Sequence, residues 1–241
     1  MILLFAGAAA AVAAVIQRLT GLAFVLVLIG PAVLIYGAVE GVTVAVLLSV
    51  VAALVAVPSG WRLIDWPRTL WLLGAGIAAA PFGVLVTRVL PEAALLLLIA
   101  GLGIIALLTP RFGGPAAAVL KGRRGALYAG ATAGFLHASS GLSGPALAAY
   151  ALGDRWEQRR FAASAQVVFL GYGAVSVLLR GLPAEPAGEM LVLSTCTAVG
   201  IVAGAALTRV VPVRVARAMM LSCAWAGIAV TLVRGVLALA G

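Results

Sequence analysis

The chain of 241 residues is 64% hydrophobic and only 10% charged, with a mean hydropathy of +1.22. Soluble domains usually carry about 25% charged residues, so this composition excludes an ordinary soluble protein and predicts an all-α integral membrane protein. The net charge of +9 comes from basic residues spread over short loops between apolar stretches, which is typical of membrane topology signals. Nucleic acid is therefore not an expected partner.

The first half of the chain is predicted to begin with two apolar arms within residues 1–37, interrupted by the polar run Gln17–Gly21. Apolar spans of roughly membrane-crossing length follow, at 41–57, 69–87 and 92–109. A basic connector rich in glycine and proline, Thr109–Arg124, then marks the midpoint of the chain.

The second half repeats this order. Two short arms are predicted within 125–153, at about 125–137 and 142–153, and three spans follow at 161–180, 190–208 and 214–234. At 1.5 Å per helical residue, the short arms cannot cross a hydrocarbon core of about 30 Å. They are therefore predicted to form a re-entrant hairpin whose tip lies inside the membrane.

Internal sequence similarity supports this duplication. Gly83–Pro91 matches Gly204–Pro212 at an offset of 121, and both segments contain Thr-Arg-Val. At nearly the same offset, Gln17–Gly21 lies opposite His137–Gly141. A repeat of this kind predicts two homologous halves, residues 1–115 and 116–241. The small-residue pairs at Gly130 and Gly134 and at Gly200 and Gly204 are expected to be helix-packing seams.

The distribution of basic residues predicts how the halves are oriented. If each pair of arms enters and leaves the membrane on the same side, the loops on the outer side hold only three of these basic residues, namely Arg88, Arg180 and Arg234. The other side then holds Arg62, Arg68, Arg111, Lys121, Arg123, Arg124, Arg155, Arg159, Arg160, Arg209, Arg214 and Arg217. The positive-inside rule favours this arrangement. It places both termini outside and inverts the second half relative to the first, as in many secondary transporters.

A helix is expected to begin at each tip, where backbone N–H groups and the helix dipole favour an anion. Hydroxyl groups and glycines near the tips would add donors and allow close approach. The predicted binding residues are Arg18, Thr20, Gly21, His137, Ser139, Ser140, Gly141 and Ser143.

Alternatives remain open for several of these residues. Arg18 can instead extend to the membrane interface, and His137 can be a packing residue bonded to a carbonyl. The serines can serve only as helix caps, and Gln166 can be an interhelical hydrogen bond.

Other chemistries have little support in the sequence. One histidine and two dispersed cysteines cannot form a metal cluster, and a P-loop lysine is missing. No carboxylate lies near His137 to orient it as a base for Ser139 or Ser140. We therefore expect no enzyme activity, no metal and no cofactor.

Two segments resemble the sulfite exporter TauE/SafE family of bacterial membrane transporters. They are Thr20–Phe24, followed by apolar residues and Pro31, and Gly134–Pro145 with its Gly-Leu-Ser-Gly-Pro ending. The chain departs from the family pattern at Ala23 and Ser143, where glycine is common, and at His137. The resemblance implies transport of sulfite, sulfonates or related organic anions across the bacterial cytoplasmic (inner) membrane.

The leading hypothesis is thus a secondary transporter of a small, sulfur-containing anion. Coupling to protons through His137 and transport driven by the membrane potential alone are both open. The alternatives are a membrane scaffold or accessory subunit, which would have tightly packed tips, and a passive anion channel. The oligomeric state is open, with a homodimer as one option.

Overall fold

The computed structural model describes residues 1–112, 120–208 and 210–240. Within these ranges it contains helices and no strand, which confirms the all-α prediction. The first half holds α1 (Ile2–Thr20), α2 (Phe24–Tyr36), α3 (Ala38–Gly60), the short 3-10 helix η1 (Trp61–Leu63), α4 (Trp66–Val89) and α5 (Glu92–Phe112). The second half holds α7 (Gly122–Ser140), α8 (Gly144–Gly153), α9 (Gln158–Arg180), α10 (Ala187–Leu207) and α11 (Val213–Ala240).

Helices long and apolar enough to cross a membrane are frequent in the described part of the chain. Six qualify, namely α1, α3 with η1, α4, α9, α10 and α11. Five of them coincide with predicted spans. The span predicted at 92–109 is helix α5, which is classed as a shorter apolar helix over Glu92–Leu108. Helix α1 is longer than the arm that was expected at the start of the chain. The chain is a multi-pass membrane protein.

The two halves have closely matched helices. Helices α1 and α7 are 19 residues long, and α3 and α9 are 23 residues long. The helix contacts also match, because α1 packs on α10 as α7 packs on α4, while α3 packs on α9 and α5 on α11. Exchanging the two halves therefore reproduces these four contacts, whereas α2 contacts α3 and α11 much more extensively than α8 contacts α9 and α5. The predicted boundary between residues 115 and 116 lies outside the described residues.

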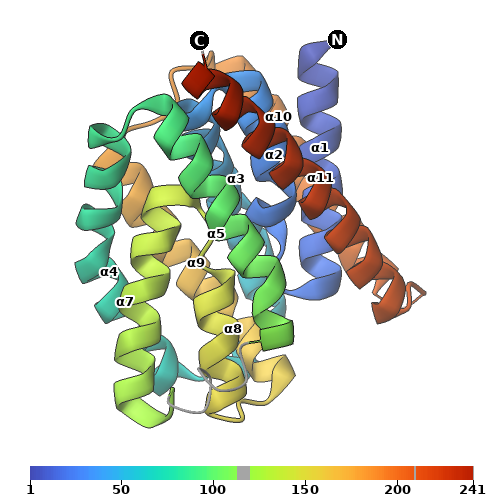
Figure 1. Cartoon of the computed structure of the whole chain (residues 1–241). Helices are drawn as coiled ribbons and strands as arrows, with labels where there is room; N and C mark the ends of the chain where they lie inside the picture. Colours follow the sequence, from blue (N-terminus) through green and yellow to red (C-terminus); the bar gives the residue numbers. More distant parts are fainter. Residues whose placement is uncertain (113–119, 209, 241) are drawn as a thin grey trace.

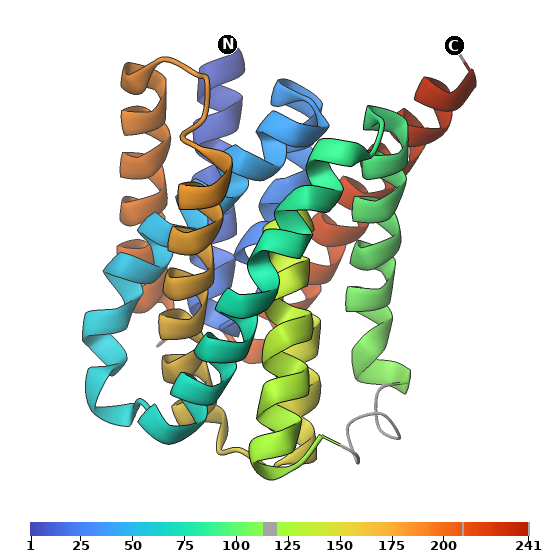
Figure 2. The same ribbon diagram turned by 90° about the vertical axis from the view of Figure 1, so that its left-hand side faces the viewer.

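The second half runs in the opposite direction to the first. Both termini lie at the same end of the molecule (Figure 1), and the view turned by 90° agrees (Figure 2). Helix α1 starts at this end, whereas α7 starts at the other end, near the α3–α4 and α8–α9 connections. Those two connections and the helix ends beside them carry Arg62, Arg68, Arg155, Arg159 and Arg160. Arg209 and the side chain of Arg111 lie outside the described residues.

The three arginines that were predicted on the same side of the membrane as the two termini all donate hydrogen bonds to carbonyl groups of helices. Arg88 donates to Leu179 O, Arg180 to Ala138 O and Arg234 to Val33 O. Each of these carbonyls lies near the C-terminus of its helix, where the dipole favours a cation.

Close glycine contacts hold the first arm of each hairpin against the scaffold. A Cβ atom on Gly134 of α7 would lie 2.2 Å from Gly76 O on α4. On the equivalent pair, a Cβ on Gly200 of α10 would lie 2.6 Å from Ala11 O on α1. Backbones this close leave no room for a side chain, so both predicted packing seams are confirmed.

Helix α7 is longer than the predicted arm at 125–137. It begins at Gly122, whose N–H donates to Asp154 Oδ1, and continues to Ser140. The hydroxyls of Ser139 and Ser140 both donate to Leu136 O in the last turn of this helix. At 1.5 Å per residue α7 is about 28 Å long, whereas α8 reaches only about 15 Å.

Candidate functional site

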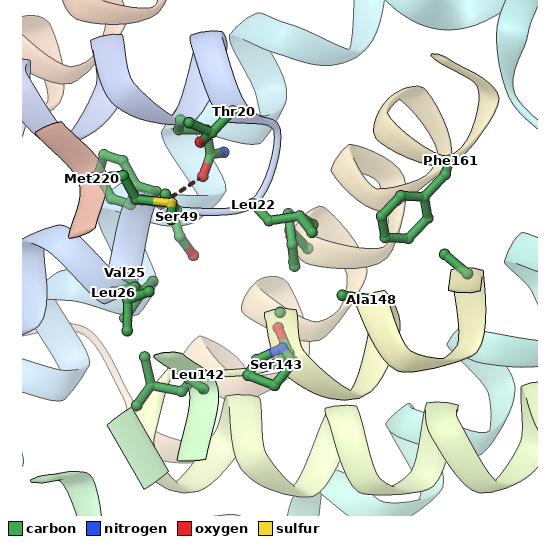
Figure 3. A pocket seen from close by; sticks show the side chains of 18 of the residues that line it. Thr20, Leu22, Val25, Leu26, Ser49, Leu142, Ser143, Ala148, Phe161 and Met220 are labelled. Atoms are coloured by element: carbon green, nitrogen blue, oxygen red, sulfur yellow. Dashed lines mark hydrogen bonds between the residues drawn. The ribbon is translucent and has the colours of Figure 1, made fainter. Parts of the chain in front are cut away.

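The two helix turns line one shared cavity of about 550 Å³. Residues of the α1–α2 turn and of the α7–α8 turn both contribute to its wall, together with residues of α3, α5, α9 and α11. Figure 3 shows this space between Thr20, Ser143 and Phe161. Because the second half runs in the opposite direction, the two turns reach this cavity from opposite ends of the molecule.

Both turns are built in the same way. Each first arm ends at a glycine in the left-handed conformation, Gly21 with φ 93° and Gly141 with φ 76°. The N–H of Gly21 donates to Gln17 O over 2.6 Å, and that of Gly141 to His137 O over 2.8 Å. Glycine is suited to this conformation because it has no Cβ to clash with the backbone. Gln17 and His137 therefore occupy equivalent positions.

The side-chain amide of Gln17 is hydrogen-bonded at both its oxygen and its nitrogen inside the protein. Its Oε1 accepts from the N–H of Phe24, the first residue of α2, over 2.9 Å. Its Nε2 donates to Gln166 Oε1 on α9 over 3.1 Å, and Gln166 Nε2 donates to Gly21 O over 3.1 Å. Gln17 thus caps the start of α2 and ties the first turn to α9.

The side chain of His137 is only half used. Its Nδ1 lies 3.0 Å from Ser143 Oγ, in hydrogen-bond contact. Its Nε2 is buried and has no partner among the described residues. Ser143 is the N-cap residue of α8, but its side chain makes no capping hydrogen bond. The start of α8 is therefore not capped by a side chain as the start of α2 is.

Four of the predicted binding residues line the cavity, namely Thr20, His137, Gly141 and Ser143. The Thr20 hydroxyl donates to Ile16 O over 2.7 Å, which leaves its lone pairs for another donor. The nearby helix starts, Ala23–Phe24 and Ser143–Gly144, also face this space.

The structure places the other four away from the cavity wall: Arg18, Gly21, Ser139 and Ser140. Arg18 packs on α10, where a Cβ added to Gly204 would lie 2.7 Å from Arg18 Cβ. Ser139 and Ser140 are completely buried, and their hydroxyls bond back to α7. Gly21 gives the turn its shape and offers its carbonyl to Gln166.

Sequence reasoning missed several lining residues, among them Ser49, Trp156, Phe169 and Arg217. Ser49, Trp156 and Phe169 come from elements distant from the tips, so the tip motif carried no signal for them. Arg217 was assigned to a basic loop, yet it lies in the first turns of α11 and reaches the cavity. For Gln166, the sequence left open an interhelical hydrogen bond or a ligand contact; in the structure this residue forms interhelical hydrogen bonds.

The electrostatic character of the cavity favours an anion. No aspartate or glutamate is among its lining residues, and Arg217, which is exposed, supplies a positive charge. The starts of α2 and α8 add the positive ends of two helix dipoles. Groups of three or more metal-binding side chains are not found among the described residues.

Comparison with known proteins identifies a family for this chain. No curated protein and no solved structure matches the chain. The family model described as sulfite exporter TauE/SafE matches residues 6–231, which is nearly the whole chain. This match confirms the family resemblance and the membrane transporter class. The chain therefore belongs to the sulfite exporter TauE/SafE family.

Proposed function

We propose that this chain is a secondary transporter that moves a small, sulfur-containing anion across the bacterial cytoplasmic membrane. The basic ends of the helices would face the cytoplasm, and both termini the outside. The anion would bind at the tips, in contact with Thr20, His137, Ser143 and the start of α8. Arg18, Gly21, Ser139 and Ser140 drop out of this revised site because they do not line the cavity.

One observation supports the proposal most directly. Two oppositely directed helix turns converge on a single cavity whose lining contains no acidic side chain. Discontinuous helices that point their N-termini into a central site are a recurring way for transporters to bind anions. A scaffold with tightly packed tips would not contain a cavity of about 550 Å³ at this place.

The lining residues of the cavity are exposed toward one end of the molecule and buried toward the other. Leu152, Gln158 and Arg217 are exposed and lie on its wall, whereas Ser49 and His137 are buried. Leu152 and Gln158 flank the α8–α9 connection, at the end opposite the termini. We expect the cavity to admit its anion from the cytoplasmic side, with Arg217 raising the local anion concentration.

Proteoliposomes that contain the purified chain test this function. We expect saturable uptake of sulfite or methanesulfonate that falls roughly tenfold in Ser143→Ala, because the hydroxyl contacts both the cavity and His137. Thr197→Ala is the matched control, since this buried hydroxyl bonds Leu193 O within α10, away from the cavity.

Three results would contradict the proposal or parts of it. An absence of anion-dependent flux would reject transport of these anions. Flux that does not saturate would indicate a passive channel. Equal loss in Ser143→Ala and Thr197→Ala would reject the assigned site.

A further inference from the structure

The buried end of the cavity lies against one face of α9. Phe169 lines the cavity and stacks on His137 with ring centroids 6.4 Å apart. A Cβ added to Gly173, one turn later, would lie 3.6 Å from both His137 Nε2 and Ser49 Oγ. Helix α9 runs from the α8–α9 connection to the end that holds the termini (Figure 2). Residues after Gly173 therefore continue this face toward the outer end of the molecule.

Polar side chains occupy the same face of α9 beyond the cavity. Residues three and four apart lie on one side of a helix, so Gly173, Ser176 and Arg180 form a row. Neither Ser176 nor Arg180 lines the cavity. Ser176 is 0% exposed, and Arg180 is half-buried. The row thus joins the buried end of the cavity to the outer end of the molecule, through protein that is closed in this structure.

The hydroxyl of Ser176 has no hydrogen-bond partner within the described residues. Other buried hydroxyls donate to a carbonyl of their own helix, as Ser49 does to Val46 O and Thr197 to Leu193 O. His137 Nε2, beside Gly173, is also buried and unpaired. Buried polar groups are normally hydrogen-bonded, so these two groups indicate a partner that the protein itself does not supply.

The guanidinium of Arg180 is not neutralised by a carboxylate in direct contact. Among the described residues, the ion pairs are those of Arg68, at the opposite end of the molecule. Glu40, on the same side as Arg180, instead accepts a hydrogen bond from the Ala184 N–H. A charged side chain near a membrane helix without an acidic partner commonly marks a pathway for ions or substrates.

The side chain of Arg180 is directed toward the tip of the second hairpin. Its Nε donates to Ala138 O over 3.2 Å, and its Nη2 donates to Ser139 O over 3.4 Å. These carbonyls belong to the two residues that follow His137 in the chain. Arg180 therefore lies over the last turn of α7 and does not extend to the membrane surface.

From these contacts we infer that Ser176 and Arg180 form a second anion site, which the anion occupies between the cavity and the outside. The anion accepts hydrogen bonds from the Ser176 hydroxyl and from the Arg180 guanidinium. That guanidinium leaves the α7 carbonyls when the outer end opens. This inference rests on the proposed function and adds an outer site to it.

The variant Ser176→Ala separates a binding role from a packing role. It removes an unpaired buried hydroxyl, so we expect the melting temperature in detergent to stay constant or rise. Saturable methanesulfonate flux in proteoliposomes should nevertheless fall roughly tenfold, because the anion loses a donor. Thr197→Ala is the matched control, since its hydroxyl is equally buried but already bonded. That control should keep its flux.

The charge of Arg180 is tested by two substitutions. Arg180→Gln can still donate to the Ala138 carbonyl but carries no charge, and we expect its flux to fall roughly tenfold. Arg180→Lys keeps the charge and should recover part of the flux. Arg234→Gln is the control, because Arg234 also donates to a helix carbonyl, Val33 O, but lies on α11. Its flux should stay at the level of the natural chain.

Cysteine labelling tests whether the second site opens to the outside. In a chain with Cys196→Ser and Cys223→Ser, Ser176→Cys would be treated in spheroplasts with a membrane-impermeant methanethiosulfonate that carries a sulfonate. We expect labelling of Ser176→Cys, and slower labelling when external methanesulfonate occupies the site. Thr197→Cys, which is equally buried, should stay unlabelled.

The outcomes distinguish this inference from the proposed function. Unchanged flux in Ser176→Ala overturns the second site but leaves transport through the cavity in place. Labelling of Ser176→Cys no faster than that of Thr197→Cys, or equal flux in Arg180→Gln and Arg180→Lys, overturns it in the same way. Absence of saturable methanesulfonate flux in the natural chain rejects the proposed function and the second site with it.

Discussion

The α1–α2 turn and the α7–α8 turn share one backbone plan but differ in how their key side chains are used. Both first arms are 19 residues long and end at a glycine in the left-handed conformation. In the first turn Gln17 has partners at both ends of its amide. In the second, His137 contacts only Ser143 and leaves Nε2 unpaired. The comparison teaches that two turns with the same backbone plan can differ in polar chemistry, because the side chain four residues before the capping glycine has partners at both ends in one turn and at one nitrogen only in the other.

The largest expected effect separates the two capping glycines. Alanine in the left-handed region costs about 1–2 kcal/mol at either position. At Gly141 the added Cβ would also lie 2.6 Å from Val25 Cγ1, whereas at Gly21 the nearest atom is 3.6 Å away. We expect Gly141→Ala to lose about 2–4 kcal/mol and Gly21→Ala about 1–2 kcal/mol, measured by denaturant unfolding in detergent. Equal losses would show that the second turn is not the tighter one.

The next effect concerns the glutamine pair of the first turn. Gln17→Leu leaves the buried amide of Gln166 and the N–H of Phe24 without their partner, at an expected cost of about 1–3 kcal/mol. In the double variant Gln17→Leu, Gln166→Leu both side-chain partners are absent. The combined loss of stability should therefore be smaller than the sum of the single losses. Additive losses would mean that the two amides do not interact.

Replacing His137 by glutamine makes the second turn carry the same side chain as the first. We expect His137→Gln to fold with a stability within about 1 kcal/mol of the natural chain, because an amide can still contact Ser143. Anion flux should fall roughly tenfold, because the free imidazole nitrogen is lost. Unchanged flux would assign His137 to packing alone.

The smallest expected effect lies at the base of the second hairpin, outside the membrane-spanning helices. Burial alone would raise the pKa of Asp154, but the Gly122 N–H and Arg68, each donating over 2.8 Å, lower it overall. A lowered pKa stabilises the fold above the ordinary value near 4, and this stability is lost as the pH falls through the folded pKa.

Asp154→Asn should therefore cost about 1 kcal/mol at pH 7 and less at pH 3. Thermal unfolding of both proteins across this range would measure the difference. A gap that stays constant with pH would rule out the carboxylate charge as its source.

Several features could be predicted from the chain alone because they depend on local chemistry. The apolar spans require helices in a bilayer, and the match of Gly83–Pro91 with Gly204–Pro212 indicated the duplication. The breaks at Gly21 and Gly141 were expected because glycine commonly ends a helix. The extra helical residues at the ends of α7 were not predicted; at its start, Gly122 contacts Asp154, 32 residues further along the chain, and such a contact is not visible in the local sequence.

The candidate site was predicted only in part, for a geometric reason. Neighbouring residues on a helix point about 100° apart, so a polar run cannot show which member faces a cavity. Gln17 lines the cavity, whereas its neighbour Arg18 packs on α10. Ser143 lines it, whereas Ser139 and Ser140 bond within α7.

The amino-acid sequence by itself determined the membrane class and the position of both turns, because hydrophobicity and the conformational freedom of glycine act locally. Tertiary structure decided which side chains meet around the cavity. The contribution of Trp156, Phe161 and Arg217 requires that α9, α11 and the α8–α9 connection pack beside the tips. The packing of these distant segments decides which face of each helix meets the cavity, and close backbone contacts such as Gly134 against Gly76 fix how the helices approach each other.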